Sequence, residues 1–282
     1  MAKRLLSFAL ASVAMAISMS AQPGVAETTE KKVIVTSDIR YREGQSQAWY
    51  LDIAEPEQTP DTGLRPAIVI IHGGGWAFGA KDDPVYRDLL MYYALQGYVT
   101  LSVEYRFTQE APMPACIEDV KCAVRWLKAH ADRYKVDPER IGVYGHSAGA
   151  HLSLMIGVSS DNKELEGDGP WQEYSSRVTC VAAGSPPTEI GNPASPWSEH
   201  PEWWPIGYFS DKASPMLLLQ GIDDAVVKVH LTDDFVNKMT AAGADVEYVR
   251  IHGHHGVAFD LHLNVTRSAM DNFFARYLKG EE

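Results

Sequence analysis

Short stretches of alternating or continuous apolar residues follow one another along most of the chain, and they predict strands. Residues 31–43 and 47–56 alternate apolar and polar positions, which is typical of half-buried antiparallel strands. Residues 66–71 form a continuous apolar run that leads into a glycine-rich turn, which indicates a strand buried on both faces. Further strands are predicted from the segments 97–107, 136–145, 177–184, 215–221 and 245–253.

Helical periodicity appears between several of these strands. Residues 85–96 have a helical pattern, and residues 266–279 form an amphipathic one at the end of the chain. A helix is also expected from Ile117 to about Tyr134, where apolar residues recur three or four positions apart. Strands that alternate with helices favour a mostly parallel sheet covered on both faces, after antiparallel N-terminal strands. We find no repeat and no low-complexity linker, so the sequence predicts one α/β domain.

The N-terminal residues are typical of an export signal. A short basic start precedes the apolar stretch Leu5–Ile17, which is too short to span a bilayer, and small residues precede a cut after Ala26. A cut at Ser20 and a buried N-terminal helix are the alternatives. We expect residues 1–26 to be a signal peptide and residues 27–282 to be the mature domain, periplasmic or secreted, with no membrane anchor.

Composition and charge narrow the choice of partners. The 282 residues are 45% hydrophobic and 22% charged, which is ordinary for a soluble globular protein with a sizeable core. A net charge of −12 repels polyanions, so we expect no nucleic acid to bind. Cys116 and Cys122 lie too far apart in the predicted helix to form a disulfide, and an odd count leaves at least one thiol free. We expect these two and Cys180 to be mainly small core residues, with a bridge to Cys180 as the alternative.

A lone serine stands among small residues at the end of one predicted buried strand. Gly145, Ser147 and Gly149 match the pattern G-x-S-x-G, in which the serine occupies a strained turn between a strand and a helix. Such a turn lifts the hydroxyl clear of the sheet at a helix N-terminus, where the helix dipole favours developing negative charge. The pattern therefore indicates a nucleophile.

A glycine-rich turn follows the predicted strand at 66–71. The segment His72–Trp76 contains three consecutive glycines, whose N–H groups are bare enough to approach a substrate oxygen closely. With the N–H of Ala148 they are expected to form an oxyanion hole. A flexible glycine turn without chemistry is the alternative. We expect His72 to brace this loop.

Two downstream loops contain the residue types that activate a serine. Asp223 and Asp224 follow one predicted strand, and His252, His254 and His255 follow a later one. The order serine, aspartate, histidine is the one used by hydrolases with this sheet architecture. The histidine takes the hydroxyl proton, and the aspartate fixes its tautomer. A metal site in the histidine run is the alternative, although no matching set of ligands lies nearby in the sequence.

The segments that carry these residues resemble the α/β-hydrolase esterases. The similarity is greatest to the family of bacterial acetylxylan and feruloyl esterases, which is related to the hormone-sensitive-lipase group. It runs from about Tyr41 onward and is most specific over residues 114–152. The resemblance implies an α/β-hydrolase fold with Ser147 as the nucleophile. Its G-x-x-D-x-x-V and H-G patterns single out Asp224 and His255. It places the oxyanion donors on Gly74, Gly75 and Ala148, with the N–H of Trp76 as a further donor.

The chain departs from this family in ways that affect the expected site. Residues 184–188 differ from the family's Y-G-P-T-D pattern, and residues 27–66 have strand patterns where related proteins with larger caps are helical. We therefore expect an open site that suits bulky or polymeric esters. The irregular stretch 185–214 is rich in aromatic residues that can stack on a sugar or an aromatic acyl group, with ordinary packing as the alternative. The substrate-binding candidates are Trp76, Trp203 and Trp204.

Together these features predict a secreted serine carboxylesterase that works through an acyl-enzyme and requires no cofactor and no metal. The resemblance alone implies the substrate class, which is short-chain or aromatic acyl esters such as acetyl or feruloyl esters of plant polysaccharide. A kynurenine formamidase-like amide hydrolase is one alternative, because the segment 145–152 is also similar to the nucleophile segment of those enzymes. A non-catalytic hydrolase-fold binding protein is another. The sequence leaves the oligomeric state open.

Overall fold

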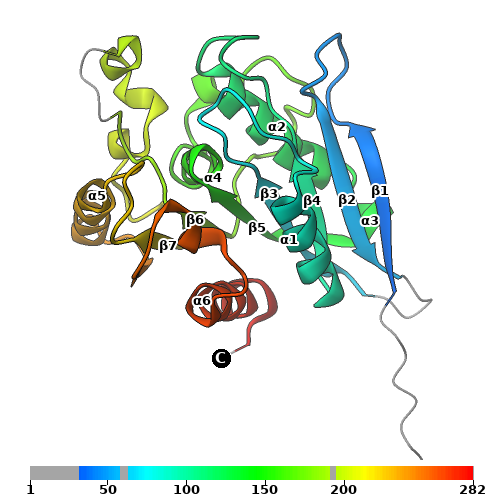
Figure 1. Ribbon diagram of the computed structural model, residues 1–282. Helices are drawn as coiled ribbons and strands as arrows, with labels where there is room; N and C mark the ends of the chain where they lie inside the picture. The colour runs from blue at the N-terminus through cyan, green and yellow to red at the C-terminus, as the bar shows by residue number, and fades with distance from the viewer. Residues whose placement is uncertain (1–31, 58–62, 191–194, 282) are drawn as a thin grey trace, which may run out of the picture. The chain divides into compact units, whose positions relative to one another are not determined.

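One eight-stranded sheet organises the described part of the chain (Figure 1). The computed structural model describes residues 32–57, 63–190 and 195–281, so the predicted signal peptide lies outside the described residues. The strand order is β1-β2-β4-β3-β5-β6-β7-β8, with β1, β2 and β4 paired antiparallel and all other neighbours parallel. The strands are β1 (Val33–Arg40), β2 (Tyr50–Pro56), β3 (Arg65–Ile71), β4 (Val99–Val103), β5 (Val136–His146), β6 (Cys180–Gly184), β7 (Met216–Gly221) and β8 (Val246–Ile251).

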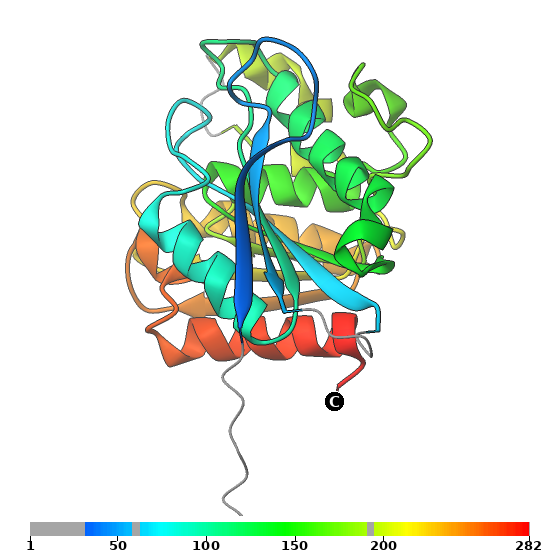
Figure 2. The same ribbon diagram turned by 90° about the vertical axis from the view of Figure 1, so that its right-hand side faces the viewer.

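Helices cover both faces of the sheet, as Figures 1 and 2 show. One hydrophobic core joins the sheet to α2, α4 and α5, and a second joins the opposite face to α1 and α6. The predicted helix after Ile117 is divided at His130, where a short second helix begins. The helices are α1 (Pro84–Leu95), α2 (Ala115–Ala129), α3 (Ala131–Tyr134), α4 (Ala148–Val158), α5 (Val229–Ala241) and α6 (Asn264–Phe274), which continues as a π-helical segment, Ala275–Lys279.

The burial of each strand follows its place in the sheet. In β3 every residue after Arg65 is buried, which confirms a strand covered on both faces. The prediction that β1 is half-buried is wrong, because this edge strand is mostly exposed. Its pairing with β2 is interrupted between Thr36 and Ile39, where Asp38 has a φ of 58°. An irregular, exposed edge of this kind discourages further strands from pairing with the sheet.

Two expectations about single residues and segments can be compared with the fold. All three cysteines are buried and unpaired, as expected of small core residues. Over the described parts of the chain, no helix combines the length and the apolar character that crossing a bilayer requires.

The parallel strands end along one edge of the sheet, and the loops beyond β3, β5, β7 and β8 carry the predicted site residues.

Candidate active site

Ser147 lies in a tight turn between β5 and α4. Its φ of 55° and ψ of −121° are strained for a residue with a side chain, and its N–H is anchored on the carbonyl of Gly184 at 2.8 Å. The flanking glycines are required by space. A Cβ at Gly145 would lie 2.2 Å from the carbonyl oxygen of Gly149, and one at Gly149 would lie 2.1 Å from that of Ile71. The G-x-S-x-G pattern is therefore a steric requirement of this turn.

His255 and Asp224 meet beyond the ends of β8 and β7. The Nδ1 of His255 lies 2.7 Å from Oδ2 of Asp224, and because a carboxylate only accepts, Nδ1 carries the proton. With the proton on Nδ1, Nε2 is the ring nitrogen that can accept a second proton. The Asp224 side chain is fully buried, whereas that of His255 is 22% exposed. This is the arrangement in which a carboxylate orients a general base.

The carboxylate of Asp224 has a hydrogen-bond partner at both oxygens. Its Oδ1 accepts the N–H groups of Val226 and Val227, each at 2.8 Å, and its Oδ2 also accepts Nε2 of Gln220 at 3.1 Å. Burial alone would raise the pKa of this carboxyl, but the hydrogen bonds from His255 and from the two valine amides hold the pKa below its usual value. Asp224 is therefore ionised where His255 needs a negative partner.

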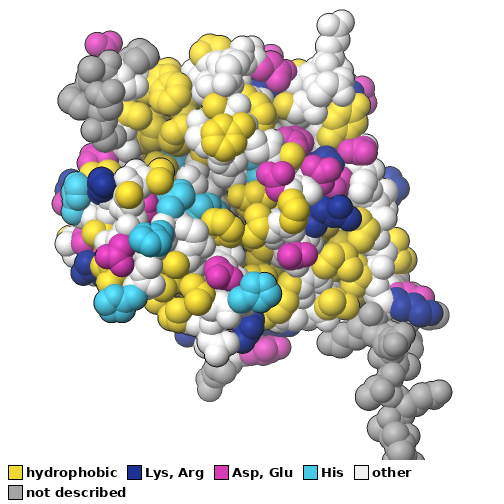
Figure 3. Space-filling view, viewed as in Figure 1, with side chains coloured by type: hydrophobic (Ala, Val, Ile, Leu, Met, Phe, Trp, Pro, Cys, Tyr) yellow, Lys and Arg dark blue, Asp and Glu magenta, His cyan; other side chains and the backbone are white. Residues whose placement is uncertain are grey.

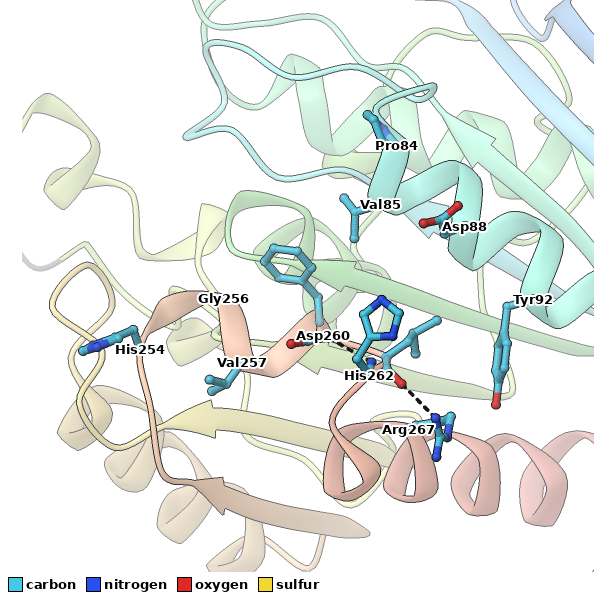
Figure 4. A pocket seen from close by; sticks show the side chains of 12 residues that line it. Pro84, Val85, Asp88, Tyr92, His254, Gly256, Val257, Asp260, His262 and Arg267 are labelled. Atoms are coloured by element: carbon cyan, nitrogen blue, oxygen red, sulfur yellow. Dashed lines mark hydrogen bonds between the residues drawn. The ribbon is translucent and has the colours of Figure 1, made fainter.

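The neighbouring acid and imidazole take different places. Asp223 is exposed, and its N–H donates to the carbonyl of Gly253. His254 is also exposed, and in Figure 4 its side chain points away from the other labelled residues. Of the two adjacent pairs, the structure brings together only Asp224 and His255.

A cavity of about 390 Å³ opens beside Ser147. Gly75 and Ala148 line it, so two of the three predicted oxyanion donors border the same space as Ser147. Gly74 belongs to the same turn but does not line the cavity. Its φ is 119°, and a Cβ at this position would lie 1.8 Å from the carbonyl oxygen of Phe78, so there is no room for a side chain. The remaining lining residues are mainly apolar: Trp76, Pro187, Glu189, Ile190, Trp204, Val226, Val227, Lys228 and Leu231.

The aromatic stretch contributes one wall of this cavity. Residues 195–208, hereafter the cap segment, form three short 3₁₀ helices: Pro196–Glu199, Pro201–Trp203 and Pro205–Gly207. Trp204 is buried and lines the cavity together with Trp76 of the glycine-rich turn. Trp203 does not line it, and its ring stacks on His200 with centroids 3.7 Å apart. Of the three predicted substrate-binding tryptophans, two border the space next to Ser147.

Comparison with known proteins shows the family of this chain. The BD-FAE family model matches residues 51–202, which is more than half of the chain. The chain belongs to the BD-FAE family. Esterase LipC and Esterase LipQ of Mycobacterium tuberculosis are 28% and 30% identical to it over 77% and 83% of its length, and the matches cover 59% of each relative.

The fold comparison leads to the same group. The solved structure of a truncated form of a carbohydrate esterase from gut microbiota has a TM-score of 0.75 and 26% identity, and the match covers 91% of this chain and 100% of that one. The α/β-hydrolase fold and the resemblance to α/β-hydrolase esterases that the sequence predicts are thereby confirmed. The chain spans 59% of the length of each of the curated relatives LipC and LipQ.

His146 and Ser185, which the sequence does not single out in this BD-FAE protein, fix the position of His255. The backbone carbonyl of His255 accepts hydrogen bonds from Nε2–H of His146 at 2.9 Å and from the hydroxyl of Ser185 at 3.1 Å. Burial lowers the pKa of His146 to about 3, so its ring is neutral and has one proton to donate. His146 stands next to Ser147 in the sequence, but nothing in the sequence indicates that its ring reaches a carbonyl 109 residues away.

A larger groove lies on the far side of the His255 loop (Figure 4). Its volume is about 800 Å³, and it runs between α1 and the segment that leads into α6, with neither Ser147 nor His255 in its lining. His254 and Gly256, on either side of His255, are part of the lining. The groove therefore lies next to His255 but does not include the predicted catalytic residues.

Histidine side chains appear on the face shown in Figure 3, spread among apolar ones. The metal alternative for the run His252–His255 requires several of them to converge. Within residues 32–57, 63–190 and 195–281, no group of three or more histidine, cysteine, aspartate or glutamate side chains is arranged to hold a metal ion. His255 has a carboxylate partner in Asp224 instead.

Proposed function

We propose that this protein is a serine carboxylesterase that uses Ser147, His255 and Asp224 as a catalytic triad. The observation that carries the proposal is the ionised, buried Asp224 behind His255, on the same sheet edge as a strained serine turn. The esterase relatives support the reaction class. The proposal extends to export through residues 1–26, which lie outside the described residues.

The chemistry follows from the protonation states. Nε2 of His255 takes the proton from Ser147 as Oγ attacks the ester carbonyl, and the resulting imidazolium is stabilised by Asp224. The N–H groups of Gly74, Gly75 and Ala148 are the proposed donors to the tetrahedral oxyanion. The imidazolium then protonates the departing alcohol and leaves an acyl group on Ser147. Water activated by the same imidazole releases the acid and restores the enzyme.

The proposed substrates are esters of short-chain or aromatic acids, including acetyl and feruloyl esters of plant polysaccharide. A cavity of about 390 Å³ with mainly apolar walls and two indoles suits an acetyl group and also accommodates a larger aromatic acid. A carbohydrate esterase among the solved structures of similar fold supports a sugar-linked alcohol.

A fluorophosphonate probe and a product assay test both levels of the proposal. We expect the probe to label Ser147 and Ser147→Ala to lower kcat by roughly a million-fold on p-nitrophenyl acetate. Retained turnover in that variant would remove Ser147 from the mechanism. Acid released from acetylated xylan, feruloylated arabinoxylan and simple acetate esters is then measured by chromatography. Turnover of N-formylkynurenine in preference to every ester would contradict the esterase assignment.

A further inference from the structure

His151 is a buried imidazole that the proposed mechanism does not use. It lies one helical turn after Ser147 in α4, is fully buried, and its backbone N–H donates to the carbonyl of Ser147 at 3.1 Å. A fully buried histidine must satisfy both ring nitrogens within the protein. The partners of those two nitrogens come from different sides of the cavity.

The ring of His151 bridges the glycine-rich turn and the cap segment. Its Nδ1 lies 3.1 Å from Nε1 of Trp76, and its Nε2 lies 2.8 Å from the carbonyl oxygen of Trp203. An indole N–H only donates and a carbonyl only accepts, so Nδ1 is the acceptor and Nε2 carries the proton. Burial lowers the pKa of His151 to about 4, which agrees with a neutral ring in this tautomer.

The same imidazole packs against both indoles of the cavity wall. Its centroid lies 5.3 Å from that of Trp76, edge to face, and 4.7 Å from that of Trp204. The two indoles meet each other at 5.6 Å and 90°. Trp76 and Trp204 line the cavity beside Ser147, whereas His151 does not. His151 therefore contacts two residues of the cavity wall without lining the cavity itself.

The backbone of the glycine-rich turn needs such support. Gly75 and Trp76 both have positive φ, 58° and 57°, and for tryptophan this conformation is strained. The neighbouring N–H groups are the proposed oxyanion donors, and their direction depends on how Trp76 is held. A hydrogen bond from its indole to a rigid helix fixes the turn relative to Ser147.

We propose that His151 is a positioning residue that couples the oxyanion turn to the cap segment and thereby sets the size preference for the acyl group. The inference rests on the proposed function, because it assigns the cavity beside Ser147 to the acyl group. The cavity contains Ser147 and two oxyanion donors but not His255, and the leaving alcohol must face His255 to receive its proton. The acyl group therefore lies against Trp76 and Trp204.

Three variants test the coupling on p-nitrophenyl acetate, butyrate and octanoate. His151→Leu keeps most of the volume and removes both hydrogen bonds. We expect it to lower kcat roughly tenfold or more, because the oxyanion donors lose their alignment, and to shift the butyrate-to-acetate ratio of kcat/KM roughly tenfold toward butyrate. Trp76→Phe keeps an aromatic ring but removes the indole donor together with part of the cavity wall, so we expect its ratio to shift in the same direction. His151→Gln retains an acceptor and a donor and should restore the ratio to within about threefold.

A matched control separates this bridge from a general loosening of the cap segment. Tyr208→Phe removes a hydroxyl that donates to the carbonyl of Glu202 at 2.8 Å and accepts from Asn162, without contact to Trp76 in either bond. We expect its acyl-chain ratio to match that of the wild type. An equal shift in Tyr208→Phe would overturn the specific role of His151.

A double-mutant cycle completes the test. If Trp76 and His151 act through one hydrogen bond, the double variant Trp76→Phe/His151→Leu is no worse than His151→Leu alone. Additive losses, or an unchanged chain-length ratio in Trp76→Phe, would refute the coupling even if His151→Leu fails to fold. Fluorophosphonate labelling of Ser147 in the wild-type protein separates the role of His151 from the proposed function. Failure of the labelling counts against the proposed function itself.

Discussion

Replacing Asp224 by asparagine isolates the electrostatic part of the proposed triad, because the side chain keeps its size. Oδ1 of Asp224 accepts two backbone N–H groups, while Oδ2 accepts the His255 imidazole and the Gln220 amide. In Asp224→Asn the single amide oxygen can accept either from the backbone N–H groups or from His255 and Gln220, but not from both sets of donors. If it keeps the backbone N–H groups, its NH₂ faces the N–H of His255, and two donors oppose each other.

The conflict is relieved when His255 changes tautomer. Nδ1 then accepts from Asn at position 224, and the proton moves to Nε2, which faces the substrate and can no longer accept a proton from Ser147. Loss of the correct tautomer in a serine triad lowers kcat by about 10⁴. At about 1.36 kcal/mol for each factor of ten, this corresponds to roughly 5 kcal/mol of lost transition-state stabilisation. We expect a fall of this size for every ester.

The assay is steady-state hydrolysis of p-nitrophenyl acetate at pH 7, together with the rate of fluorophosphonate labelling. Asp223→Asn is the matched control, since Asp223 is exposed and stands one residue away. We expect its kcat to be within about twofold of the wild type. The reasoning is refuted if Asp224→Asn retains more than about a tenth of the activity, or if Asp223→Asn loses as much.

Three further outcomes follow from the structure. Gly149→Ala, which forces a Cβ to 2.1 Å from a backbone oxygen, should cost roughly 3 kcal/mol or more in urea denaturation, whereas Gly63→Ala, with no atom within 4 Å, should change little. The pKa of Asp224 in the folded protein lies below its usual value, so its contribution to stability is present above the unfolded pKa of about 4 and is lost as pH falls through the folded pKa. The difference in unfolding free energy between wild type and Asp224→Asn should therefore shrink as pH falls below about 4. A difference that stays constant with pH would contradict this linkage. Ser185→Ala removes one of two donors to the carbonyl of His255 and should lower kcat several-fold with little change in KM, as measured on p-nitrophenyl acetate.

Much of the fold could be predicted because its signals are local. The apolar run in β3 and the steric demand for Gly145 and Gly149 are visible in short segments of sequence. The choice of Asp224 over Asp223 came from a family pattern, and the structure gives it a physical reason: only Asp224 turns inward to the amides of Val226 and Val227. Local chemistry and family pattern agree at these positions.

Other features could not be predicted because they depend on how distant segments approach each other. Trp203 and Trp204 are adjacent and equally aromatic, yet the short turns of the cap segment direct only Trp204 into the cavity. Ser185, an unremarkable serine in the sequence, has a φ of 48° and reaches a carbonyl 70 residues away. No periodicity or motif encodes such contacts, because one partner is a backbone atom.

The contacts to backbone atoms divide the site into two parts with different consequences. The proposed base, His255, is held through its backbone carbonyl by His146, the last residue of β5, and by Ser185, the residue after β6. Its position relative to Ser147 is therefore set by the sheet. The cavity wall is held through His151, whose partners belong to a turn and to the cap segment. Changes on the first side should therefore lower the rate for all esters alike. Changes on the second should alter which acyl groups are preferred, because Trp76 and Trp204 form the wall that the proposed acyl group contacts.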